Sequence, residues 1–346
     1  MSTRRALRNL ISPPALGVIA LALAVVLTAP LRAQPGQATF DLCSLDNSSD
    51  VVIGACSSVI ETGLLRPPLL ADVLTRRGHA FYVSGQFAGA LADYTRAAEL
   101  VPDRAAYYRH IGAARSNLLR GSSDALAIAE QLEKSLLDFN RAINLDPKNA
   151  ENLVHRGVVY VALGRIERGL DDLDQAVTLD PNSATARDSR GRAHLARNDF
   201  PRAIADFDAA LSLQPTLASA RLNRGIAHDR MEDYTSAIED FTAVIDQIPN
   251  SAGAFNNRGM SYAKRGRTEQ AIEDFSQAIL LDPSFAGAYF NRGQAYFLKG
   301  DKDRALADYI QARQISPQFP EPSADLFEDY QIDVPGEYRP RRPFRN

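Results

Sequence analysis

The sequence lacks the short motifs that mark the common catalytic sites. It contains no nucleophile elbow, Walker loop, GxGxxG stretch or metalloprotease motif. It has five histidines, but these follow no recognisable ligand spacing, and a zinc site needs three or four converging ligands. These absences predict that the protein is not an enzyme and that it has no catalytic residues, no metal and no cofactor.

The chain also lacks an excess of basic residues. It has 39 lysines and arginines against 42 aspartates and glutamates, a net charge of −3. Four of the arginines lie in residues 1–33, which contain no acid, so the remainder carries 35 basic and 42 acidic residues, or −7. Nucleic-acid-binding domains usually present a basic face, so the charge predicts no nucleic-acid partner.

Residues 1–33 have the composition of a targeting segment. Arg4, Arg5 and Arg8 precede an uninterrupted small and apolar stretch over residues 15–29. The paired arginines also fit a twin-arginine signal, so the export route stays open between the two secretion pathways. We therefore expect a protein outside the cytoplasm, periplasmic or secreted, and of bacterial type.

The cleavage of this segment is a second open question. Ala33 offers a cleavage point before Gln34, but Leu31 stands where a smaller residue is usual. The alternative is an uncleaved signal anchor, although the apolar run is slightly short for a span of about 20 residues. In that case residues 15–31 hold the protein at a membrane, and this segment is its only membrane contact.

The chain has only two cysteines, Cys43 and Cys56, which lie 13 residues apart. In an oxidising compartment such a pair predicts a structural disulfide, and the lack of a nearby histidine argues against a metal site. Residues 50–62 read as a helix with Ile53, Cys56 and Ile60 on one stripe. We expect residues 34–68 to form an N-terminal cap that the disulfide pins in place.

A period of 34 residues dominates the rest of the chain. The unit that shows it most plainly, residues 286–317, reads as two amphipathic helices joined at Gly300. The proline that closes each unit recurs at Pro147, Pro181, Pro215, Pro249, Pro283 and Pro317. A glycine of the first helix recurs at Gly78, Gly112, Gly157, Gly191, Gly225, Gly259 and Gly293.

This pattern of small and aromatic residues at a 34-residue period resembles the tetratricopeptide repeat (TPR) family. The resemblance covers residues 69–319 and implies an all-α fold, a right-handed α-solenoid of seven TPR helix–turn–helix repeats. It also implies that the first helices line a concave groove that binds a ligand. Repeats of this kind are platforms without chemistry of their own, so the resemblance implies a scaffold for protein–protein interaction.

Two parts of the chain depart from the period. The closing prolines Pro102 and Pro147 are 45 residues apart, which indicates an 11-residue insertion in the second repeat. Residues 124–144 contain no glycine or proline, so we expect a second helix lengthened at its N-terminal end; a disordered loop is the alternative. Residues 320–346 are predicted to form a C-terminal cap, around Leu326 and Phe327, and a disordered basic, proline-rich tail.

Six repeats carry an arginine directly before the glycine and an aspartate sixteen residues later. The arginines are Arg77, Arg156, Arg190, Arg224, Arg258 and Arg292, and the aspartates are Asp93, Asp172, Asp206, Asp240, Asp274 and Asp308. In the second repeat Asp138 is present, but Ile111 replaces the arginine. This regularity predicts a ladder of internal ion pairs; a stripe that binds anions is the alternative.

The residue two before the glycine is expected to face the groove. It is Arg76, His110, His155 and Ser189 in the first four repeats and Asn223, Asn257 and Asn291 in the last three. The asparagines resemble ladders that hold an extended peptide by its backbone, although they could instead satisfy groups of the adjoining repeat. The predicted peptide-binding residues are Asn223, Asn257, Asn291, Met260, Lys264, Phe290 and Gln294. Lys264 and Arg230 match the family's basic clamp only loosely.

The sequence therefore predicts a non-enzymatic scaffold outside the cytoplasm that binds a polypeptide segment in the concave groove. The alternative is a structural or assembly component of a cell-envelope complex, attached through the convex face or the basic tail. In both cases the partner is a protein or peptide whose identity the sequence does not reveal.

Overall fold

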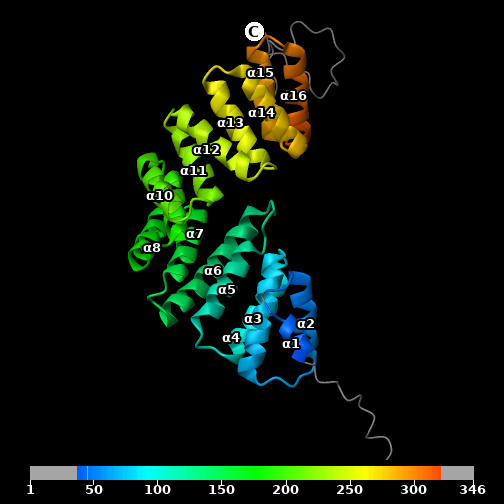
Figure 1. Ribbon diagram of the computed structural model, residues 1–346, viewed down its shortest axis with the longest axis vertical. Helices are drawn as coiled ribbons and strands as arrows, with labels where there is room; N and C mark the ends of the chain where they lie inside the picture. The colour runs from blue at the N-terminus through cyan, green and yellow to red at the C-terminus, as the bar shows by residue number, and fades with distance from the viewer. Residues whose placement is uncertain (1–36, 45, 321–346) are drawn as a thin grey trace, which may run out of the picture. The chain divides into compact units, whose positions relative to one another are not determined.

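The computed structural model describes residues 37–44 and 46–320, in which every regular element is an α-helix (Figure 1). The chain divides into two compact units, residues 1–101 and 102–346. The predicted targeting segment and residues 321–346 of the predicted C-terminal region lie outside the described residues.

The first unit contains two cap helices and one helical pair. Its elements are α1 (Gln37–Leu42), α2 (Ser49–Glu61), α3 (Pro67–Val83) and α4 (Phe87–Leu100). Helix α2 packs on α3 through Val52, Cys56 and Val59, while the predicted stripe residues Ile53 and Ile60 are half-buried beside them.

The cysteine pair holds α1 and α2 together. The Sγ atoms of Cys43 and Cys56 are 1.99 Å apart, and both side chains are buried. Arg76 of α3 donates a hydrogen bond from Nη1 to the carbonyl oxygen of Cys43 at 3.0 Å. The segment that contains Cys43 is thus connected both to α2, through the sulfur atoms, and to the first repeat.

Over residues 102–320, the second unit contains six helical pairs in chain order (Figure 1). They are α5 (Ala105–Asn117) with α6 (Ala125–Leu145), α7 (Ala150–Ala162) with α8 (Ile166–Leu179), α9 (Ala184–Ala196) with α10 (Phe200–Leu213), α11 (Ala218–Arg230) with α12 (Tyr234–Gln247), α13 (Ala252–Lys264) with α14 (Thr268–Leu281), and α15 (Ala286–Leu298) with α16 (Lys302–Ile315). With α3 and α4 these make seven pairs. Among the described residues, the predicted all-α fold and its seven helix–turn–helix repeats are confirmed.

The contacts between helices explain where the groove lies. Each first helix packs on the second helix of its own pair and on that of the preceding pair within the second unit. Successive first helices also contact one another, whereas no contact of that extent joins successive second helices in the described chain. The first helices therefore lie on the inner, concave side of the second unit.

The insertion in the second repeat is mostly helical. Helix α6 has 21 residues, against 14 in each of the other second helices. It begins at Ala125, and the side chain of Asp124 accepts a hydrogen bond from the backbone of Ala127 at its N-terminal end. The rest of the insertion lies in the connection that precedes α6, rather than in the helix.

The glycine of each first helix is required by a close approach to the second helix. A Cβ atom on Gly225 would lie 2.8 Å from the ring of Phe241, and one on Gly191 would lie 2.6 Å from that of Phe207. Both rings are almost fully buried. The small residue in the first helix and the large one in the second therefore form one packing unit, as the sequence pattern indicates.

The predicted ion-pair ladder is confirmed in all six repeats that carry both residues. Nε and Nη2 of each arginine donate to the two carboxylate oxygens of the aspartate at 2.6–2.9 Å. Each aspartate is buried. Hydrogen bonding to Asp274 raises the pKa of Arg258 above its ordinary value, and the other arginines of the ladder behave alike.

The third donor of each arginine connects neighbouring helical pairs. Nη1 bonds the helix before it, at Ser57, Asn140, Asp174, Asp208, Thr242 and Ser276, over 2.6–3.1 Å. Ser57 belongs to α2. Beside the first repeat, this helix therefore takes the place that the second helix of the preceding pair takes in the later repeats. In the second repeat Asp138 accepts a hydrogen bond from Nε of Arg115 at 2.9 Å. Arg115 lies one helical turn after Ile111, which holds the place of the ladder arginine.

Candidate binding groove

The predicted groove residues lie on three neighbouring first helices of the second unit. Asn223 is on α11; Asn257, Met260 and Lys264 are on α13; Phe290, Asn291 and Gln294 are on α15. All of them are at least partly exposed. The structure thus brings the predicted set onto adjoining helices, but their side chains have different surroundings.

Two of the three asparagines are engaged with the preceding first helix. Asn291 donates from Nδ2 to Oδ1 of Asn256 at 2.9 Å. The Asn223 side chain faces the carboxyl of Asp188 and lowers its pKa, and Asp188 accepts a hydrogen bond from the Ser219 hydroxyl at 3.3 Å. Both contacts join first helices of successive repeats, so the structural interpretation applies to these two positions.

The carboxyl of Asp188 illustrates how buried this junction is. Asp188 is 7% exposed, and burial raises its pKa above the ordinary value. The positive charge of Arg192 and the hydrogen bonds from Ser219 and Asn223 partly offset that rise. Asn223 therefore serves a buried acid on the neighbouring helix.

Asn257 differs from the other two asparagines. Its side chain has no hydrogen-bond partner among the described residues, because the residue 35 positions earlier is Leu222, whereas Asp188 and Asn256 hold that place for Asn223 and Asn291. Asn257 lies on a hollow of about 200 Å³ between α11 and α13. The hollow is lined by Ile226, Asp229, Arg230, Phe241, Asn257 and Met260.

The charges beside this hollow are unequally satisfied. Asp229 accepts from the Ser261 hydroxyl at 2.9 Å and from Nζ of Lys264 at 2.5 Å. The Lys264 ammonium also lies 5.5 Å from the centre of the Tyr234 ring. Lys264, predicted to contact a ligand, is therefore already paired within the protein. Arg230 is exposed and has no ion pair in the part of the chain that the structure describes.

The remaining predicted residues lie at the C-terminal end of the groove. Phe290 packs against Tyr309 and Phe319, with ring centres 5.4 and 5.2 Å apart. Gln294 is exposed, and Phe297 is 38% exposed. Phe290 therefore contributes partly to the packing of the last repeat, while Gln294 stays open to a ligand.

At the other end of the second unit, two basic side chains of the first helices are already engaged within the protein. Arg109 pairs with Glu151 at 2.6 Å. His155 stacks on Phe139 with ring centres 5.6 Å apart, and its burial, together with nearby Arg109, lowers its pKa. His194 of α9 is buried.

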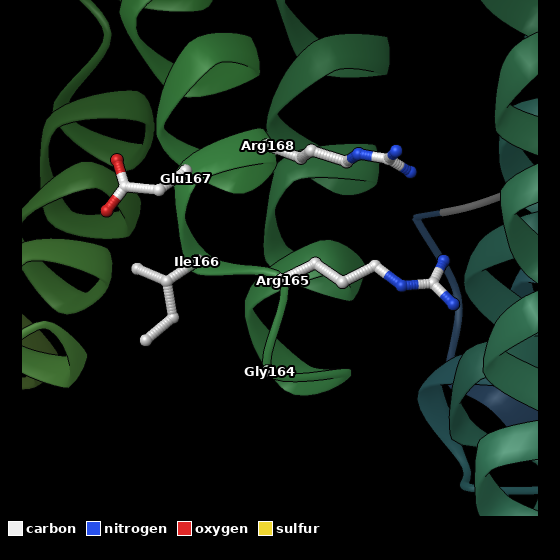
Figure 2. A pocket seen from close by; sticks show the side chains of 5 residues that line it. All are labelled: Gly164, Arg165, Ile166, Glu167 and Arg168. Atoms are coloured by element: carbon white, nitrogen blue, oxygen red, sulfur yellow. The ribbon is translucent and has the colours of Figure 1, made fainter.

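A larger, open hollow of about 630 Å³ lies at the turn between α7 and α8. Figure 2 shows Arg165 and Arg168 extending to one side of this turn and Ile166 and Glu167 to the other. Arg165 pairs with Glu133 of α6, and Glu167 lies 3.3 Å from Arg197. Most charged groups of this second hollow are thus already paired within the protein, so the groove is the better candidate for a binding site.

Sequence reasoning missed Asp229 and Phe241 as parts of the hollow. Phe241 could have been found, because it follows Gly225 at the spacing that places Tyr309 after Gly293. Within residues 37–44 and 46–320, no cluster of three or more histidine, cysteine or acidic side chains could hold a metal ion. In the same residues, no helix has both the length and the apolar composition needed to cross a membrane.

Comparison with protein families finds tetratricopeptide repeats along the second unit. Models of this repeat match residues 150–183, 190–254 and 286–319, and a TPR repeat model matches residues 259–300. No curated protein sequence matches the chain.

Solved structures share the fold at low sequence identity. A tetratricopeptide repeat protein from Parabacteroides merdae is 21% identical, with 72% of this chain and 94% of that chain covered and a TM-score of 0.54. A chain of the APC/C hetero-tetramer Cut9–Hcn1 is 14% identical, with 82% and 52% covered and a TM-score of 0.61. PilF of Pseudomonas aeruginosa is 16% identical, with 62% and 93% covered and a TM-score of 0.52.

Proposed function

Because the chain is a tetratricopeptide repeat protein, and such proteins are typically scaffolds that bind protein or peptide partners, we propose that its concave groove binds a segment of another polypeptide. On this proposal the protein catalyses no reaction. The observation that carries the proposal is Asn257, whose amide faces no protein partner in the described chain and lies on a hollow that has Ile226, Phe241 and Met260 in its walls.

The chemistry of Asn257 suits a polypeptide backbone. An asparagine side chain offers one carbonyl acceptor and an NH₂ donor, which match the donor and acceptor of a peptide group. Packed helices lie about 8–10 Å apart, and an extended chain advances about 3.3 Å per residue. A segment that crosses the groove would therefore meet one helix about every third residue, whereas a segment that follows one helix would meet a further turn of it about every second residue.

The proposed location is outside the cytoplasm. The structure places Cys43 and Cys56 in a disulfide, which is typical of proteins in oxidising compartments. The basic and apolar composition of residues 1–33 supports export to the periplasm or beyond the cell.

Single alanine substitutions separate a binding asparagine from a structural one. Asn257→Ala should leave the melting temperature unchanged and weaken peptide binding by roughly 2- to 10-fold, the loss of one hydrogen bond. Asn291→Ala should lower the free energy of unfolding by about 1 kcal/mol, because Asn256 loses its donor. The probes are peptides selected on the wild-type protein from a displayed library of random dodecapeptides, with calorimetry measuring binding.

Unchanged binding by Asn257→Ala would contradict the proposed role of this residue. Selected peptides that bind equally well after groove changes, but not after removal of residues 321–346, would instead favour the assembly component attached through its tail.

A further inference from the structure

We infer that the hollow between α11 and α13 selects, within the bound polypeptide, an aliphatic side chain accompanied by a carboxylate two residues away. This inference rests on the proposed function and specifies the chemistry of the segment that the groove accepts. The inference rests on two features of the hollow. Part of its wall is apolar, and its arginine, Arg230, forms no ion pair with a described residue.

The walls of the hollow are suited to one apolar side chain. Ile226 and Met260 are half-buried on facing first helices, and Phe241, 1% exposed, belongs to the second helix α12 of the same repeat as Ile226. A cavity of about 150 Å³ accepts a benzene molecule. A hollow of about 200 Å³ therefore has room for the side chain of leucine, isoleucine or valine.

The charged group at the hollow that remains free to bind a ligand is positive. Asp229 is satisfied by Ser261 and Lys264, so it offers little to a basic ligand, and Lys264 is neutralised by the same contact. Arg230 is exposed and has no ion pair among the described residues. A carboxylate is the group that its guanidinium binds with the best geometry, through two parallel hydrogen bonds.

The spacing of the two groups follows from the extended backbone. Side chains of an extended chain alternate, so residues two apart face the same side about 6.6 Å from each other. Arg230 follows Ile226 by one turn of α11, which rises about 6 Å. An aliphatic residue in the hollow thus places a carboxylate two residues away beside Arg230, while Asn257 meets the backbone.

Synthetic peptides test this inference directly. Three acetylated and amidated peptides of glycine and serine carry Leu-Ser-Asp, Leu-Ser-Lys or Ala-Ser-Asp at their centre. Fluorescence anisotropy should show Leu-Ser-Asp binding about tenfold or more tightly than Ala-Ser-Asp, and several-fold more tightly than Leu-Ser-Lys. A fourth peptide that ends in a free carboxylate two residues after leucine distinguishes a terminal from a side-chain carboxylate.

Charge reversal at one residue adds a test that folding defects cannot imitate. Arg230→Glu should reverse the preference, so that Leu-Ser-Lys binds more tightly than Leu-Ser-Asp. The matched control is Arg168→Glu, an exposed arginine at the α7–α8 turn that has no ion pair among the described residues (Figure 2). This control should leave the preference for Leu-Ser-Asp unchanged.

Equal binding of all peptides, or a preference that Arg230→Glu leaves unaltered, would overturn the inference while polypeptide binding in the groove stands. The inference is likewise overturned if none of these peptides binds although library-selected peptides do. If no library peptide binds in a way that depends on the groove, the proposed function itself fails.

Discussion

Arg258→Leu is expected to lower the free energy of unfolding by about 3–5 kcal/mol, because it leaves a buried carboxylate without its partner. Asp274 is 5% exposed and accepts two hydrogen bonds from Arg258, both at 2.8 Å. The substitution also removes the bond from Nη1 to Thr242 of the preceding pair. Chemical denaturation of the full chain, followed by circular dichroism, measures the loss.

The second substitution, Asp274→Asn, should recover much of this loss when it is combined with Arg258→Leu. Replacing both partners removes the uncompensated charge, and an apolar residue, Ile111, already holds this place in the second repeat. Arg202→Leu is the matched control, because Arg202 is 68% exposed and its partner Asp199 keeps a contact with Arg197; a change within about 0.5 kcal/mol is expected. Strict additivity in the double-mutant cycle would show that the ladder carries no coupling energy.

Replacing both cysteines by serine should lower the free energy of unfolding of the first unit by about 3 kcal/mol. A cross-link between residues 13 apart restricts the unfolded chain by about this amount in the chain-entropy model. Hydrogen exchange of the amides in α2, α3 and α4 of the full-length protein reports this loss locally, whereas exchange in α11 to α16 should not change.

Reduction of the wild-type protein provides the control for this experiment. It breaks the same bond without introducing hydroxyl groups at two buried positions, and it should reproduce the faster exchange. Complete alkylation of Cys43 and Cys56 without prior reduction would show that the bond is absent in the isolated protein.

The fold could be predicted from the sequence because its rules are local and repeated. The 34-residue period placed the helical pairs outside the second repeat, and the lengthened helix α6 was expected from Asp124 and begins at Ala125. The arginine ladder was predictable for a similar reason, since a fixed spacing of 16 residues joins the two helices of one pair. Each of these relations recurs many times in one chain.

The groove was less predictable because its side chains depend on neighbours in other repeats. Asn257 and Asn291 hold equivalent positions, yet one faces Leu222 and the other Asn256 at the same offset of 35 residues. Lys264 matched a ligand-binding residue in type, but Asp229 on the adjoining helix neutralises it. In the second repeat Asp138 pairs with Arg115, which lies one helical turn after the position that carries the arginine in the other six repeats.

Site-specific photo-cross-linking tests most directly whether the concave groove is the polypeptide-binding surface. A benzophenone amino acid is placed at Ile226, on the hollow, or at Leu280, which is 73% exposed on the second helix α14. Each full-length variant is irradiated with the library-selected peptides, and adducts are mapped by mass spectrometry. Binding in the groove predicts adducts from position 226 and none from position 280. Adducts from position 280 alone, or from neither position while the peptides stay bound, would contradict it.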